Sequence, residues 1–386
     1  MLIRNGLLLD EDFTFRPGSV QTAGDQISAI LPDPPEMTAA AAGPATGGET
    51  VDADGCYVVP GLVDIHIHGC AGRDFCDGNP GALDVMSHYL ARQGVTSFMP
   101  ASLALPEERL TAAFAQAATF KEQQPADAAA LAGIYLEGPF FAREKRGAHA
   151  AEYIIPIDND MLDRLINASG DLIQVACIAP EIPGALDFIA RWRSRLTLSV
   201  AHTTADYATA AAAFAAGATQ VTHLFNAMNP FGHREPGVPG AAFDQGANVE
   251  LISDGIHLHP AVIRAAFRLY GPERVILVSD AMAACGMPDG EYLLGDLNVR
   301  VAGGTARLLN GTIAGSATNL MEAVRRAVRF GIPLADALRA ATANPARVTG
   351  LRDRIGTLAA GRQADLVLLN RQLEVVRVML RGRWLS

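Results

Sequence analysis

Apolar residues follow two different spacings along the chain. Eight short segments are rich in β-branched and other apolar residues and predict buried strands. Between most of them, stretches such as "ALDVMSHYLARQG" and "HPAVIRAAFRLYG" carry apolar residues at helical spacing. The eight predicted strand segments are residues 62–68, 95–101, 132–137, 173–179, 197–202, 219–225, 248–254 and 274–280.

Strands that alternate with helices predict parallel βαβ units. Eight such units over residues 61–345 predict an α/β fold of the (β/α)8 TIM-barrel type, in which the catalytic residues stand at the carboxyl ends of the strands. A doubly wound sheet is the alternative. It would place a glycine-rich phosphate-binding fingerprint after the first strand, and the sequence has none there.

The two ends of the chain show the alternation of half-exposed strands instead. Residues 1–31 have this pattern, and so does the C-terminal stretch "GTLAAGRQADLVLLNRQLEVVRVMLRGRWL". We therefore predict a small β-sandwich domain built from residues 1–60 and 346–386, beside a barrel domain of residues 61–345. Residues 32–50 are rich in Pro, Ala and Gly and predict a loop.

Composition narrows the possible functions. The 386 residues carry a net charge of −10 and no basic stripe, so we expect no nucleic-acid partner. No segment reaches the about 18 apolar residues of a membrane helix, and the N-terminal residues turn acidic too early for a secretory signal. The five cysteines are irregularly spaced without a CxxC pair, which is typical of reduced thiols. We therefore expect a cytoplasmic protein that binds no membrane.

Polar residues recur where the predicted strands end. The first strand ends in "DIHIH", and alternate residues of a strand share a face, so His66 and His68 point the same way. One histidine at such a position is usually a satisfied core residue, but repetition over several strands indicates a site. The later strands contribute Glu137, His202, His223, Asp254, His257 and Asp280.

Imidazole and carboxylate groups in one place suit divalent metal ions. Four histidines can hold two ions, with Glu137 bridging them; zinc is expected, and iron, cobalt and manganese are alternatives. Such ions would lower the pKa of water towards neutrality. Asp280 would stay ionised beside the cations, accept a proton from that water and later pass it to a leaving amine. His257 would donate a hydrogen bond to a carbonyl or oxyanion, or else support a neighbouring side chain.

Eight short motifs follow one another between residue 60 and about residue 319. They are "PGLVDIHIHG", "LEGPF", "GAH", "VTHLFNAMNPF", "REPG", "SDGIH", "VSDAM" and "TIAGS". In this combination and order they resemble the N-acetylglucosamine-6-phosphate deacetylases of the amidohydrolase superfamily. An isolated HxH pair would be weak evidence, whereas "LEGPF", "HLFNAM", "REPG" and "DGIH" together are specific. The terminal β-rich regions match as well, so the resemblance covers nearly the whole chain.

The resemblance implies hydrolysis of the acetamido group of a phosphorylated amino sugar, with release of acetate. It gives Asp280 the role of the proton-transfer carboxylate. Some members lack the HxH pair, so the presence of His66 and His68 favours two metal ions. Members are commonly dimers, and we expect a homodimer here. The metal-ligand roles fall by motif on Glu137, His202 and His223.

The resemblance also implies a set of substrate contacts. Arg234 in "REPG" is the expected phosphate partner, because the fork of a guanidinium matches a phosphate. His257 in "DGIH" is expected near the substrate carbonyl. The implied substrate-binding residues are Ala148, His149, Asn226, Ala227, Arg234, His257, Ile313, Ala314 and Gly315.

Other functions fit parts of the pattern. Dihydroorotases and hydantoinases usually carry a carboxylated lysine on the fourth strand, but "IQVACIAPE" contains no lysine. An adenosine deaminase is another alternative, but the phosphate loop "NPFGHREPG" would have no purpose for a neutral heterocycle. A deacetylase of N-acetylgalactosamine 6-phosphate stays an alternative, because the preference for one epimer of a sugar hydroxyl can depend on a single contact. A non-catalytic scaffold barrel would be expected to have lost ligands that this chain keeps.

Overall fold

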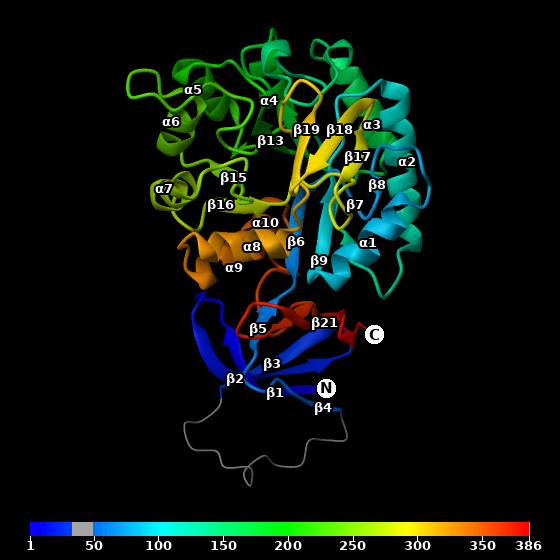
Figure 1. Ribbon diagram of the computed structural model, residues 1–386, viewed down its shortest axis with the longest axis vertical. Helices are drawn as coiled ribbons and strands as arrows, with labels where there is room; N and C mark the ends of the chain where they lie inside the picture. Colours follow the sequence, from blue (N-terminus) through cyan, green and yellow to red (C-terminus); the bar gives the residue numbers. More distant parts are fainter. Residues whose placement is uncertain (33–48, 386) are drawn as a thin grey trace.

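The computed structural model describes residues 1–32 and 49–385, and its larger part is built on a curved sheet of parallel strands (Figure 1). Most of the predicted loop 32–50 lies outside the described residues. Each of the eight predicted strand segments contains one observed strand, so the parallel βα arrangement is confirmed. These strands are β6 (Leu62–Ile67), β9 (Val95–Pro100), β11 (Ile134–Leu136), β12 (Ile173–Ile178), β13 (Thr197–Val200), β14 (Gln220–Val221), β15 (Asn248–Ile252) and β16 (Val275–Val278).

Backbone pairing gives all eight strands the same direction. β6 pairs with β9, and β11 to β16 form one continuous parallel ladder. Single-residue parallel bridges join Ala101 to Tyr135 and Ile67 to Ala281, so they link these two groups at both sides. Every residue of β6 is buried, as expected for a parallel strand that is covered on both faces. The carboxyl ends of the strands therefore meet at one edge.

Helices surround the parallel strands (Figure 1). Their amphipathic sequences explain the arrangement: α8 buries Leu320 and Val324 and leaves Arg329 exposed. The α-helices of the described residues are α1 (Ala82–Arg92), α2 (Glu107–Gln123), α3 (Asn159–Ala168), α4 (Ala185–Trp192), α5 (Tyr207–Ala216), α6 (Gly237–Asp244), α7 (Pro260–Tyr270), α8 (Leu320–Arg329), α9 (Leu334–Ala341) and α10 (Ala343–Val348). Short 3₁₀ turns are η1 (Arg143–Lys145) and η2 (Ala151–Tyr153).

Both ends of the chain contribute to a second, mixed sheet below the parallel strands (Figure 1). Its order is β22-β21-β20-β5-β1-β2-β3, and β4 also pairs with β1. A separate apolar core that includes Ile3, Val58 and Leu366 stabilises it. The strands are β1 (Leu2–Leu9), β2 (Phe15–Ala23), β3 (Gln26–Pro32), β4 (Thr50–Asp52), β5 (Tyr57–Pro60), β20 (Leu366–Leu369), β21 (Val375–Leu380) and β22 (Arg383–Trp384).

The junction between the two sheets is close-packed. Gly61 separates β5 from β6, and its backbone N–H donates to the carbonyl of Asp365. A Cβ atom on Gly61 would lie 2.0 Å from Thr96 Oγ1, so only glycine fits there. The first strand that carries site residues is therefore fixed directly against the second sheet.

A three-stranded antiparallel sheet follows β16 and was not predicted from the sequence. It consists of β17 (Gly290–Leu294), β18 (Leu297–Ala302) and β19 (Thr305–Leu308). The turn between β17 and β18 holds Asp296, which accepts hydrogen bonds from Arg109 on α2 and from Tyr153 on η2. Smaller additions are β10 (Ala130–Leu131), which pairs with β9, and the hairpin β7 (Gly69–Cys70) and β8 (Arg73–Asp74). No helix among the described residues is long and apolar enough to span a membrane.

Candidate active site and metal centre

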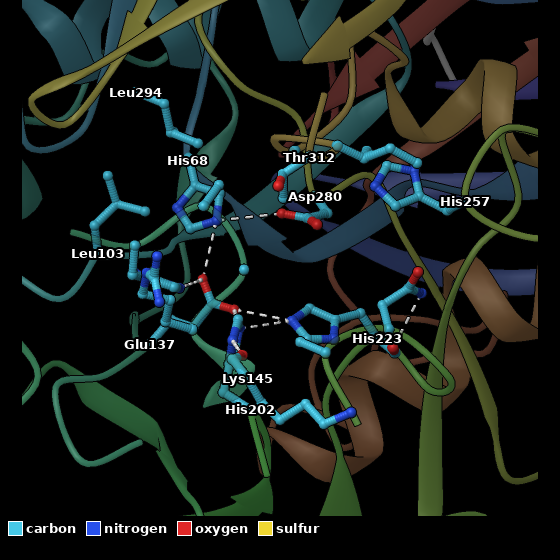
Figure 2. A pocket seen from close by; sticks show the side chains of 18 of the residues that line it. His68, Leu103, Glu137, Lys145, His202, His223, His257, Asp280, Leu294 and Thr312 are labelled. Carbon is cyan, nitrogen blue, oxygen red and sulfur yellow. Dashed lines mark hydrogen bonds and ion pairs between the residues drawn. The ribbon is translucent and has the colours of Figure 1, made fainter. Parts of the chain in front are cut away.

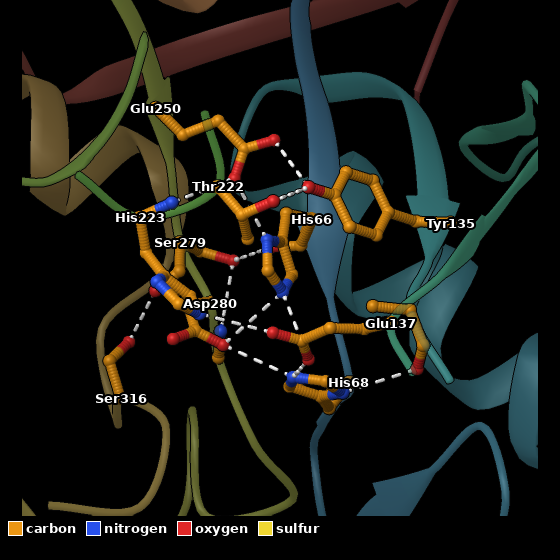
Figure 3. Close-up of polar contacts among 12 residues, drawn as sticks. His66, His68, Tyr135, Glu137, Thr222, His223, Glu250, Ser279, Asp280 and Ser316 are labelled. Atoms are coloured by element: carbon orange, nitrogen blue, oxygen red, sulfur yellow. Dashed lines mark hydrogen bonds and ion pairs between the residues drawn. The ribbon is translucent and has the colours of Figure 1, made fainter. Parts of the chain in front are cut away.

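Six predicted site residues come together at the carboxyl edge of the parallel sheet (Figures 2 and 3). His66 and His68 lie at the end of β6, and the others come one or two residues after the ends of β11, β13, β14 and β16. Three of them leave their strands with a left-handed backbone, which is uncommon for residues other than glycine. These are His202 (φ 46°), His223 (φ 28°) and Asp280 (φ 44°).

One candidate metal-binding group, the Glu137 group, consists of Glu137, His202 and His223. Glu137 Oε1 lies 3.2 Å from His202 Nε2 and 3.1 Å from His223 Nε2. The two ring nitrogens are themselves 3.1 Å apart. His202 Nδ1 lies 2.8 Å from the carbonyl of Lys145, which fixes the ring and leaves Nε2 directed at the carboxylate.

A second group, the His66 group, consists of His66, His68 and Asp280. His68 Nε2 lies 3.2 Å from Asp280 Oδ1 and 3.0 Å from Glu137 Oε2. His66 Nε2 is 3.5 Å from Glu137 Oε2 and makes no hydrogen bond, although it is buried. Glu137 therefore faces one group with each of its carboxylate oxygens. A buried nitrogen without a partner, aimed at carboxylates, fits a cation ligand.

The electrostatics of this cluster favour positive charge. Burial would lower the pKa of His68, but its hydrogen bonds with Asp280 and Glu137 raise the pKa to about 10. Burial would raise the pKa of Asp280, but His68 and His66 lower it to about 2. The carboxylates thus keep protons on neighbouring imidazoles, and a divalent cation could take the place of those protons.

A group of buried polar residues lies next to the cluster, on the far side of the His66 ring from His68 (Figure 3). Glu250 on β15 is fully buried and contacts His66 Nδ1 at 3.0 Å. Tyr135 stacks on the His66 ring and donates a hydrogen bond to Glu250. The sequence analysis missed both residues. The available signal was a single glutamate inside the otherwise apolar stretch "NVELI".

A cavity of about 460 Å³ opens above the cluster, within the size range of small-molecule sites (Figure 2). Two predicted substrate residues do not line it: Arg234 is exposed on its loop, and Ala314 is fully buried. Predicted substrate residues that do line it are Ala148, His149, Asn226, Ala227, His257, Ile313 and Gly315. Lining residues that the sequence analysis missed include Leu103, Glu144, Lys145, Arg146, Leu294, Asn310 and Thr312.

Two histidines of the cavity wall are oriented by hydrogen bonds. His149 Nδ1 accepts from the backbone N–H of Ala104, so its Nε2 carries the hydrogen. Burial and the neighbouring His202 lower the pKa of His149 to about 3, which keeps this ring neutral. His257 Nδ1 lies 2.7 Å from Asp254 Oδ2, and the other Asp254 oxygen accepts the backbone N–H of His257. Asp254 therefore supports His257 rather than reaching the cluster.

Comparison with known proteins assigns the family. A family model described as the amidohydrolase family matches residues 57–385. The chain belongs to the amidohydrolase family. The resemblance found in its motifs is confirmed by an N-acetylglucosamine-6-phosphate deacetylase of Bacillus subtilis, which is 35% identical over 99% of this chain and 96% of its own length. An N-acetylgalactosamine-6-phosphate deacetylase of Escherichia coli O157:H7 is 34% identical over 100% of this chain and 99% of its own.

Solved structures of amidohydrolases give the same result. A variant of the N-acetyl-D-glucosamine-6-phosphate deacetylase of Mycobacterium smegmatis, in complex with N-acetyl-D-glucosamine-6-phosphate, has a TM-score of 0.90 and 35% identity. The similarity covers 100% of this chain and 99% of that one. The two candidate metal-binding groups are consistent with this family assignment.

Proposed function

We propose that this amidohydrolase hydrolyses the acetamido group of N-acetyl-D-glucosamine 6-phosphate to glucosamine 6-phosphate and acetate. The observation that carries the proposal is Glu137, which faces two candidate metal groups at the floor of a cavity lined by family-motif residues. The relatives at about 35% identity over the full length support the choice of substrate.

The metal groups would hold two divalent ions, one in the Glu137 group and one in the His66 group. Zinc is our expectation, with iron, cobalt and manganese as alternatives, because imidazole and carboxylate ligands suit all four. When bound, such an ion polarises an amide carbonyl and lowers the pKa of a water molecule. The unpartnered Nε2 of His66 and the carboxylate between the groups are the features that fit this role.

Asp280 is the proposed proton carrier. Its carboxylate stays ionised because His68 and His66 lower its pKa to about 2 against the effect of burial. An ionised Oδ oxygen at the cavity floor can accept a proton from the attacking water. When the amide C–N bond breaks, the same oxygen returns the proton to the sugar nitrogen, which leaves as an amine.

Two histidines are proposed to hold the acetamido group. His149 is neutral with its hydrogen on Nε2, so it is a hydrogen-bond donor towards the cavity at any ordinary pH. His257 offers Nε2 to the cavity because Asp254 takes its Nδ1 hydrogen, and it donates from Nε2 when both nitrogens are protonated.

The phosphate group of the substrate is proposed to bind positively charged side chains at the rim of the cavity. Lys145 and Arg146 line the cavity in the same chain. Arg234, the phosphate partner implied by the family motif, is exposed and does not line the cavity of its own subunit. We propose a homodimer, in which Arg234 would reach a phosphate across the subunit interface. The guanidinium would then form a bidentate pair with the phosphate.

The proposed architecture is a closed (β/α)8 barrel of residues 61–345 with a small sandwich domain of residues 1–60 and 346–386. The two single-residue bridges between β6, β9, β11 and the segment after β16 support closure. α10 crosses the proposed boundary and contacts β16 and β6, so it would belong with the barrel. Five free cysteines support a reducing, cytoplasmic location.

A substrate panel with metal analysis of the same preparation tests the proposal. We expect acetate release with the highest kcat/KM for N-acetylglucosamine 6-phosphate, and bound divalent metal. R234A should raise KM for the phosphorylated sugar about 10-fold or more, because hydrogen bonds to charged groups contribute about 1.5–3 kcal/mol. The unphosphorylated sugar is the control and should be unaffected. No acetate release from the phosphorylated sugar by metal-loaded protein would disprove the proposal.

A deacetylase of N-acetylgalactosamine 6-phosphate is the second candidate. The Escherichia coli relative of that name, at 34% identity over the full chain, is the observation that favours it. A higher kcat/KM for the galactose epimer in the same panel would select this candidate. A non-catalytic scaffold is disfavoured, because both candidate metal groups and Asp280 are assembled.

A further inference from the structure

Glu250 is a buried carboxylate next to the candidate metal groups, with no lysine or arginine paired to it in the described residues. Burying a carboxylate is costly unless hydrogen bonds compensate. Its oxygen Oε1 accepts from Tyr135 Oη at 2.9 Å and from Gln220 Nε2 at 2.6 Å. Its oxygen Oε2 lies 3.3 Å from the backbone nitrogen of His223 and 3.0 Å from His66 Nδ1 (Figure 3).

These four contacts determine which nitrogen of His66 carries a hydrogen. The Nε2 group of Gln220 and the backbone N–H of His223 can only donate, so both Glu250 oxygens act as acceptors. The remaining contact on Oε2 therefore requires a hydrogen on His66 Nδ1. With its hydrogen fixed on Nδ1, the ring can present the lone pair of Nε2 to a cation that takes the place of a proton, and Nε2 is the buried atom without a hydrogen bond that faces Glu137 and Asp280.

We propose that Glu250 is a positioning residue that holds His66 in the tautomer and orientation needed to bind a divalent cation. It also holds the backbone of His223, and thereby supports both candidate metal groups from one carboxylate. The proposal rests on the metal site proposed above, but it concerns cation binding and not the choice of substrate. A carboxylate on the second nitrogen of a metal-binding histidine is a recurring way to orient the ring.

Tyr135 fixes the plane of the His66 ring by stacking on it. Its ring stacks on His66 with a centroid distance of 4.4 Å and an interplanar angle of 22°. Its hydroxyl contacts both Glu250 and Thr222 Oγ1, the latter at 2.8 Å. Thr222 belongs to this group of buried polar residues but has no contact with His66 among the described interactions. It therefore provides a matched control for loss of a buried polar group.

The test is a zinc titration of chelator-stripped protein by calorimetry, for the wild type, E250Q and T222V. E250Q keeps the shape of the side chain but removes the charge, and we expect zinc binding to weaken about 10- to 100-fold at one or both sites. T222V should bind zinc as the wild type does. Cobalt-loaded E250Q should also show an altered visible absorption spectrum, which a general loss of stability would not produce.

The outcome that overturns the proposal is E250Q with a cooperative thermal transition and wild-type zinc affinity. If E250Q does not fold, nitrogen NMR of histidine-labelled, zinc-loaded wild-type protein decides the question. Zinc on His66 Nε2 with a hydrogen on Nδ1 supports the proposal, and zinc on Nδ1 refutes it. Normal zinc binding in a wild-type protein without deacetylase activity would refute only the proposed function.

Discussion

At the scale of single residues, three site residues adopt an unfavourable backbone conformation that directs their side chains into the cluster. His202, His223 and Asp280 adopt positive φ angles of 46°, 28° and 44° where their strands end. Non-glycine residues in this region cost on the order of 1–3 kcal/mol each and persist where the surrounding structure enforces them. Here the adjoining strands and the hydrogen bonds to ring nitrogens enforce them, so each side chain turns into the cluster.

Asp280→Asn tests the proton-transfer role. The amide cannot accept the proton from water, so kcat should fall by about 10²–10⁴. Asn tolerates the left-handed backbone at this position, so the fold should be kept. Metal in the Glu137 group should also stay bound, because Asp280 is not part of that group. Steady-state kinetics and metal analysis measure both effects, and near-normal kcat would remove Asp280 from this role.

The site residues at strand ends could be predicted because periodicity locates the end of a parallel strand and parallel ends share an edge. His66, His68, Glu137, His202, His223 and Asp280 follow this rule. Glu250 does not, since it lies inside a strand where the pattern predicts a core residue. The position of Arg234 could not be predicted either, because it lies in a loop whose conformation has no periodic signal.

At the scale of elements, the β17–β19 sheet is the addition that shapes the cavity. Leu294 at the end of β17 lines the cavity, and so do Asn310 and Thr312 just after β19. The sequence analysis found the helices and strands of the repeating unit but missed this sheet. It follows the last predicted strand and interrupts the βα repeat, so the repeat itself gave no reason to expect it.

Asp296→Ala tests whether this sheet helps to hold substrate. Asp296 accepts from Arg109 at 2.8 Å and from Tyr153 at 2.9 Å, and these contacts join the β17–β18 turn to α2 and η2. Such exposed contacts contribute about 0.2–1 kcal/mol each, so we expect KM to rise up to about 5-fold with kcat and metal content unchanged.

Asp289, just before β17, provides a matched control for the loss of an aspartate next to this sheet. Asp289 accepts only from Gly303 and Gly304 within the described contacts, so D289A should leave KM unchanged. Equal KM values for D296A and the wild type would show that the turn has no part in substrate binding.

At the scale of the whole molecule, we expect metal binding and folding to be linked. The cluster buries Glu137, Asp280 and Glu250 within one polar layer, and their negative charge lacks a matching cation from lysine or arginine in the described residues. A ligand that binds only the folded state stabilises it by about 2.7 kcal/mol at 100 times its Kd. The bound metal is therefore expected to contribute to stability as well as to catalysis.

Removal of metal with a chelator should lower the melting temperature. In the metal-free protein only protons on the imidazoles balance the buried carboxylates, and the stabilisation that the bound cation supplies is lost. Differential scanning calorimetry before and after chelation measures the effect, with metal content checked on the same sample. Added zinc should restore the melting temperature and added magnesium should not, because magnesium prefers oxygen ligands. An unchanged melting temperature in metal-free protein would contradict this expectation.

The antiparallel pairing of β5 with β20 also has a consequence during synthesis on the ribosome. Pro60 pairs with Leu366, so the strand that leads into β6 lacks its neighbour until almost the whole chain has been made. At roughly 5–20 residues per second, that delay lasts on the order of tens of seconds. During this time β5 presents an open edge, which nascent-chain chaperones or later helices must shield from other chains.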